Sequence, residues 1–65
     1  MSDFKDRLNT ERKELSDKIS KLESFTNSTK FSSTDITQQA LLNVQLQAMK
    51  TYRTCLIERM TSLID

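Results

Sequence analysis

The sequence predicts an all-α fold: an antiparallel two-helix hairpin, with a polar connection near residues 26–34, that assembles into a helical homo-oligomer. Three observations favour this fold. The chain has neither glycine nor proline, and tight turns with positive φ need glycine whereas long helices tolerate its absence. Apolar residues recur at helical spacings in two long blocks. The second block carries more apolar residues than one helical partner can cover.

The first helix is expected over residues 3–25. Its apolar residues recur mostly at spacings of three, four or seven, which is the period of a helix face: Phe4, Leu8, Leu15, Ile19, Leu22 and Phe25. Asp3 and Asp6 lie where the positive end of the helix dipole favours acids. Glu14 and Lys18 form an acid-before-base pair one turn apart, which supports a solvent-exposed helix.

The connection is expected over residues 26–34, TNSTKFSST. Serine, threonine and asparagine compete with the backbone for hydrogen bonds and therefore favour turns and helix caps. Ser33, Thr34 or Asp35 is suited to cap the second helix, and Phe31 is expected to tuck beneath the turn as a small plug. A short connection between two helices implies an antiparallel hairpin.

The second helix is expected over residues 35–63 and carries two apolar stripes. The first stripe is predicted to pack on the first helix and consists of Leu42, Leu46 or Gln45, Met49, Tyr52, Leu56, Met60 and Leu63. The second, weaker stripe consists of Leu41, Val44, Ala48 and Cys55. Because an exposed apolar stripe marks an interface, the second stripe is predicted to pack on another copy of the chain.

The length of the chain supports the same conclusion. With 65 residues it is expected to form a single domain, residues 1–65. A chain this short buries only about 60% of its unfolded surface and is marginal alone. The single cysteine excludes an internal disulfide, and the lone thiol fits a reducing cytosol. Oligomerisation is therefore the expected source of further burial.

The composition leaves little room for catalysis. There is no histidine, which excludes Ser–His and Cys–His arrangements, and the lack of glycine excludes a P-loop. Cys55 is interpreted as a small buried hydrophobe. We expect no enzyme activity, no metal site and no cofactor. The net charge of +1 disfavours DNA binding, and no apolar run approaches the roughly 20 residues of a membrane span.

The candidate ligand-binding residues are cations and aromatic residues that border the apolar faces. They are Phe4, Arg7, Lys18, Lys21, Tyr52, Arg53 and Arg59. Arginine offers a bidentate fork for phosphate, lysine a point charge, and an aromatic ring stacks on a base. The alternative is that these cations are rim residues that pair with Glu23 or Glu58, and that Tyr52 belongs to the core. The remaining cations, Lys50 among them, are expected to be solvated.

Two motifs resemble a known family, the small phage anti-CBASS proteins of the anti-CBASS protein two type, which share their hairpin domain with one type of anti-Thoeris protein. In the first helix the matching residues are Glu14-Leu15-x-x-Lys18-Ile19-x-Lys21-Leu22-x-x-Phe25, then Ser28-x-x-Phe31. In the second they are Gln39-Ala40-Leu41-Leu42-x-x-Gln45-Leu46-x-Ala48-Met49-x-x-Tyr52, then Leu56-x-x-Arg59-Met60.

The resemblance implies a host-cytoplasmic, phage-encoded sponge for cyclic oligonucleotide second messengers. Such proteins are helical hairpins that assemble into compact oligomers, typically hexamers, and hold cyclic dinucleotides or trinucleotides between subunits without cleaving them. In relatives an N-terminal aromatic residue stacks on a base and a lysine contacts phosphate. The corresponding candidates are Phe4 and either Lys18 or Lys21. The rival interpretation is a structural hairpin or adaptor module that binds no small ligand.

Overall fold

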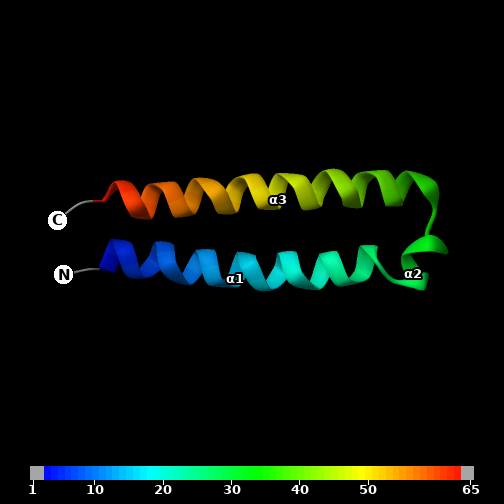
Figure 1. Cartoon of the computed structure of the whole chain (residues 1–65), viewed down its shortest axis with the longest axis horizontal. Helices are drawn as coiled ribbons and strands as arrows, with labels where there is room; N and C mark the ends of the chain where they lie inside the picture. The colour runs from blue at the N-terminus through cyan, green and yellow to red at the C-terminus, as the bar shows by residue number, and fades with distance from the viewer. Residues whose placement is uncertain (1–2, 64–65) are drawn as a thin grey trace.

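The computed structural model describes residues 3–63, and every regular element in that range is a helix. Helix α1 spans Asp3–Thr26, α2 spans Thr29–Ser32 and α3 spans Ile36–Ser62. Helices α1 and α3 run antiparallel side by side, with α2 at the closed end, and the start of α1 lies beside the end of α3 at the open end (Figure 1). The all-α prediction is confirmed. Residues 1–2 and 64–65 of the predicted domain lie outside the described residues.

Hydrogen-bonding side chains set the ends of the two long helices. The Thr26 hydroxyl donates to the Glu23 carbonyl at 2.9 Å, in the last turn of α1. At the start of α3 the Asp35 carboxylate accepts the Thr37 amide at 3.1 Å, so Asp35 is the N-cap. Leu63 is the C-cap. The predicted range 35–63 therefore included both caps of α3.

The connection contains one helical turn that the polar composition did not predict. The Ser28 hydroxyl accepts the Phe31 amide at 3.3 Å and so caps α2. Phe31 meets Phe25 edge to face, with ring centroids 5.9 Å apart, in the plugging position expected for it. On the α3 side, the side-chain amide of Gln39 donates to the Thr34 carbonyl at 2.8 Å. The turn is therefore closed by aromatic packing and side-chain hydrogen bonds without any glycine.

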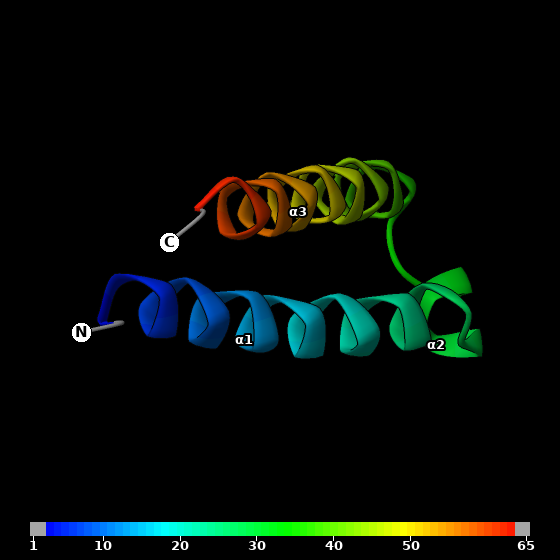
Figure 2. The ribbon, with the colours of Figure 1, turned by 60° about the vertical axis from the view of Figure 1, so that its left-hand side comes forward.

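The core is a single row of side chains between α1 and α3. The buried residues are Leu8, Leu15 and Ile19 from α1 and Leu46 and Leu56 from α3, joined by the partly buried Leu22, Met49, Met60 and Leu63. The hairpin measures 49 × 15 × 13 Å, and both views show the described residues as one layer of two helices (Figures 1 and 2). One layer leaves each helix with an uncovered outer face.

The outer faces of the two helices differ in charge. Helix α1 carries six acids and six bases, namely Asp3, Asp6, Glu11, Glu14, Asp17, Glu23, Lys5, Arg7, Arg12, Lys13, Lys18 and Lys21. Helix α3 is three residues longer, 27 against 24, but its charged residues are only Lys50, Arg53, Glu58 and Arg59. The outside of α1 is thus densely charged, whereas that of α3 combines uncharged polar side chains with exposed apolar ones.

The second apolar stripe lies on this uncharged face. Leu41 is 56% exposed and Val44 is 65% exposed, and Ala48 is exposed as well. Cys55 is also exposed, so the expectation that its thiol is buried is wrong within the single hairpin. The reason is that Cys55 lies on the outer side of α3, next in sequence to the buried Leu56.

Substitutions at Leu56 and Thr54, two residues apart on α3, are expected to change the free energy of unfolding by very different amounts. Leu56 is fully buried, so Leu56→Ala is expected to lower the free energy of unfolding by about 2–5 kcal/mol through lost burial and a residual cavity. Thr54→Ala, on an exposed position, is expected to change it by less than about 0.5 kcal/mol. Urea unfolding at one fixed protein concentration measures both. Equal effects would contradict this placement of the core.

Candidate functional site

Two cross-helix contacts fix the register of the hairpin along one of its sides. Near the open end, the Arg59 guanidinium lies 5.7 Å from the centroid of the Phe4 ring, within cation–π distance. Further along, the Tyr52 hydroxyl donates a hydrogen bond to the Glu11 carboxylate. Phe4 and Glu11 are seven residues apart on α1, and Tyr52 and Arg59 are seven apart on α3. Each pair therefore spans two turns of one helix face.

Further candidates fall on the same side. Arg7 lies one turn past Phe4 and one turn before Glu11, and Lys18 lies two turns past Glu11. We call these six residues the Tyr52 flank: Phe4, Arg7, Glu11, Lys18, Tyr52 and Arg59. Lys21 follows Lys18 by three residues, on the outer edge of this side. The structure thus brings most of the predicted site residues to one flank and spreads them along it, with Phe4 and Lys18 about 21 Å apart.

The flank is open and solvated. Phe4 is 50% exposed and Tyr52 is 44% exposed, and the side chains of Arg7, Lys18, Lys21 and Arg59 belong to exposed residues. The assignment of Tyr52 to the buried stripe is therefore wrong: its ring lies at the edge of the interface between the helices, and its hydroxyl reaches Glu11. An aromatic ring with one free face can stack on a base.

Glu11 raises the pKa of Tyr52. The hydrogen bond to the Glu11 carboxylate raises the pKa of Tyr52 above 10.0, assisted by desolvation and by the Glu11 charge, while the positive charge of Arg59 opposes the shift. The raised pKa extends the pH range in which the hydroxyl stays protonated and donating to the alkaline side of 10.0. Glu11 was not among the predicted site residues. Its position seven residues from Phe4 was the signal that could have found it.

Arg7 lies in a mainly acidic environment. It lines an open hollow of about 260 Å³ together with Asp3, Asp6, Thr10, Glu11 and Glu14. These carboxylates compete with any phosphate for the guanidinium. Within a single hairpin, Arg7 is thus the weakest phosphate-binding candidate on the Tyr52 flank.

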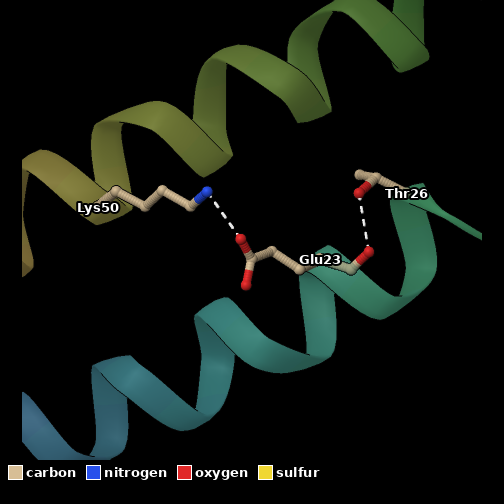
Figure 3. Close-up of polar contacts among 3 residues, drawn as sticks. All are labelled: Glu23, Thr26 and Lys50. Carbon is tan, nitrogen blue, oxygen red and sulfur yellow. Dashed lines mark hydrogen bonds and ion pairs between the residues drawn. The ribbon is translucent and has the colours of Figure 1, made fainter.

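Arg53 lies on the opposite side of the hairpin, with Glu23 and Lys50. The Lys50 ammonium is 2.7 Å from the Glu23 carboxylate (Figure 3), so the expectation of a simply solvated Lys50 is wrong. The hydrogen bond from Lys50 and then its charge lower the pKa of Glu23, and the Arg53 charge adds to the effect. This agrees with the alternative interpretation, in which cations at the rim pair with Glu23. The structure does not bring Arg53 to the Tyr52 flank.

The sequence of residues 2–62 matches the Sequestin family. The chain belongs to the Sequestin family. The match confirms the resemblance to the anti-CBASS protein two type. The family name refers to sequestration, which is how a sponge protein acts. No curated protein and no solved structure matches the chain. Between residues 3 and 63, no helix is long and apolar enough to cross a membrane.

Glu11→Gln is expected to return the Tyr52 pKa towards 10.0, because the substitution removes the charged acceptor that raises it. Tyr52 is the only tyrosine and the chain has no tryptophan, so the ultraviolet absorbance of the phenolate reports this one group. Glu14→Gln, which removes a nearby charge without touching Tyr52, is the control and is expected to leave the titration nearly unchanged. A wild-type titration at 10.0 would contradict the hydrogen bond.

The same shift has a consequence for stability at alkaline pH. A raised pKa in the folded state means that the folded chain holds the proton more tightly than the unfolded chain. This contribution is fully present below pH 10.0 and is lost as the pH rises through the folded-state pKa. The loss is expected to disappear in Glu11→Gln and to persist in Glu14→Gln.

Proposed function

We propose that this protein binds and sequesters cyclic oligonucleotide second messengers, cyclic dinucleotides or trinucleotides, in the host cytoplasm and so blocks CBASS-type antiphage signalling. The observation that carries the proposal is the match to the Sequestin family over residues 2–62, in a chain whose motifs resemble phage sponge proteins. We propose that the ligand is held without being cleaved, so that sequestration alone removes the signal.

The Tyr52 flank supports a ligand of this kind. It presents two exposed rings, Phe4 and Tyr52, beside the guanidinium of Arg59. Rings and guanidinium planes stack on bases, and the same guanidinium offers paired donors to a phosphodiester oxygen. Lys18 adds an ammonium further along the flank. It lies two helical turns, about 10.5 Å, past Glu11 and the Tyr52 ring, so a phosphate at Lys18 and a base on Tyr52 would be separated by about that distance.

Assembly supplies what one hairpin lacks. The flank is open and its residues are exposed, whereas small-molecule sites bury most of their ligand. We propose that copies of the chain, six as in the resembling family, bring their flanks together and enclose the ligand between subunits. Lys21 and Arg7 are then suited to reach a phosphate from a neighbouring copy.

Isothermal titration calorimetry against a panel of cyclic di- and trinucleotides tests the proposal directly. At least one member is expected to bind with a Kd below about 1 μM, or about −8 kcal/mol. Mass spectrometry of the released ligand is expected to recover the intact ring, and a linear product would contradict sequestration without cleavage. No heat from a folded assembly would favour the structural module, in which the cations are only rim charges.

Lys18→Ala is expected to weaken binding at least tenfold, because it removes a charge-assisted contact to phosphate. Lys13→Ala, which removes the same charge from an exposed position of α1 away from the flank, is the matched control and is expected to bind as wild type. Size-exclusion chromatography of the two variants beside the wild type is the check that neither substitution changes the assembly state. Equal affinities for the two variants would remove Lys18 from the site.

A further inference from the structure

The Glu11 carboxylate is held at the rim of the exposed Tyr52 ring. The Tyr52 hydroxyl donates to Oε2 of Glu11, across 41 residues of sequence, and this bond is the main cause of the raised pKa of Tyr52. Because the two residues belong to α1 and α3, packed helices position both side chains. Glu11 and Tyr52 are nevertheless exposed. The flank therefore presents a stacking surface with an acid fixed at its edge.

The fixed carboxylate can accept further hydrogen bonds. An ionised carboxylate has two oxygens that together accept about four hydrogen bonds, and it donates none. The Tyr52 hydroxyl uses one of these positions, on Oε2. A base that stacks on the Tyr52 ring brings its edge near this carboxylate, because the hydroxyl marks the end of the ring beside Glu11. The edge that binds there must carry N–H donors.

The charges along the Tyr52 flank place a base, and not a phosphate, beside Glu11. The Arg59 guanidinium lies over Phe4, which precedes Glu11 by two turns of α1, and Lys18 follows Glu11 by two turns. Each step is about 10.5 Å along the helix. The two cations attract phosphate, whereas the Glu11 charge repels it. The middle of the flank is thus suited to the uncharged part of a nucleotide.

Among the four bases of RNA, guanine matches a carboxylate best. Its Watson–Crick edge has two adjacent donors, N1–H and the N2 amino group, one for each carboxylate oxygen. In adenine and cytosine the amino group lies beside a ring nitrogen that is an acceptor, which a carboxylate repels. Uracil has one donor, N3–H, between two carbonyl oxygens. A carboxylate at the base edge therefore discriminates in favour of guanine.

We propose that Glu11 is the specificity-determining residue of the Tyr52 flank and that the sequestered ring contains guanine. The guanine stacks on the Tyr52 ring and donates from N1–H and the N2 amino group to the Glu11 carboxylate, which the Tyr52 hydroxyl positions. The inference rests on the proposed function, because such bonds discriminate strongly only where assembly encloses the ligand and water does not replace a lost bond.

Three cyclic dinucleotides that differ only in their bases test the proposal on the wild-type protein. In isothermal titration calorimetry, cyclic di-GMP is expected to bind about tenfold or more tightly than cyclic di-AMP. Cyclic di-IMP, whose base keeps N1–H and lacks the N2 amino group, is expected to lie between them. Binding of any guanine-free ring as tightly as cyclic di-GMP would overturn the proposal and leave sequestration intact. A folded protein that binds no cyclic nucleotide would contradict the proposed function, and the base preference with it.

Glu11→Gln is expected to move the preference towards adenine. The glutamine amide has one acceptor and one donor, which match the N6 amino group and N1 of adenine. The ratio of the Kd values for cyclic di-AMP and cyclic di-GMP is expected to fall by about tenfold or more. Glu14→Gln, which removes the same charge from another exposed position of α1, is the matched control and is expected to keep the wild-type ratio. An unchanged ratio in Glu11→Gln would overturn the proposal.

Tyr52→Phe separates the ring from its hydroxyl. The ring stays available for stacking, but the bond that holds the Glu11 carboxylate is lost, so the ratio of the two Kd values is expected to fall towards one. Equal weakening of both ligands, with the wild-type ratio kept, would overturn the positioning role of the hydroxyl. Circular dichroism and size-exclusion chromatography of each variant beside the wild type check that the helices and the assembly state are unchanged.

Discussion

Burial between only two helices is the constraint on which the rest of this structure depends. A single layer hides one stripe of each helix, and within the described residues only Ile19 and Leu56 are the large side chains that become fully buried. On α3, Leu46 is also buried and Met49 and Met60 are partly buried, but Leu41 and Val44 stay exposed. The chain meets this constraint asymmetrically, because the outside of α1 is densely charged and the outside of α3 is nearly free of charge between Ile36 and Ile57 apart from Lys50 and Arg53. The proposed assembly would therefore also supply burial that a single hairpin lacks.

The two sides of the hairpin carry different cross-helix contacts, an ion pair on one side and contacts of aromatic residues on the other. On one side Lys50 neutralises Glu23 at 2.7 Å, and such a partly exposed pair contributes little to stability, about 0–1 kcal/mol. On the other side the cross-helix contacts engage aromatic residues, with Arg59 on Phe4 and Tyr52 on Glu11. Exposed rings beside cations contribute little to a fold and much to recognition of a base or phosphate. The Tyr52 flank is thus the side whose rings and cations stay exposed to a ligand.

Much of the fold could be predicted from the sequence. The helical spacing of the apolar residues defines the two long helices, and the polar residues 26–34 define the turn between them. The exposed stripe of Leu41 and Val44 was predicted for the same reason: helical period specifies which residues share a face. What period cannot specify is the axial register between two helices. The bond from Tyr52 to Glu11 and the pairing of Lys50 with Glu23 depend on that register. Helix α1 can cover only one of two adjacent stripes of α3, the one with Leu56 or the one with Cys55. It covers Leu56, because a leucine side chain buries more apolar area than a cysteine side chain does.

Arg59 links the open end of the hairpin to the rest of the Tyr52 flank. Its guanidinium lies over the Phe4 ring, and its positive charge opposes the rise in the pKa of Tyr52. A guanidinium that is already held against a ring loses less freedom when a phosphate arrives than a mobile one does. Under the proposed function, the contact with Phe4 therefore orders Arg59 in advance for phosphate binding.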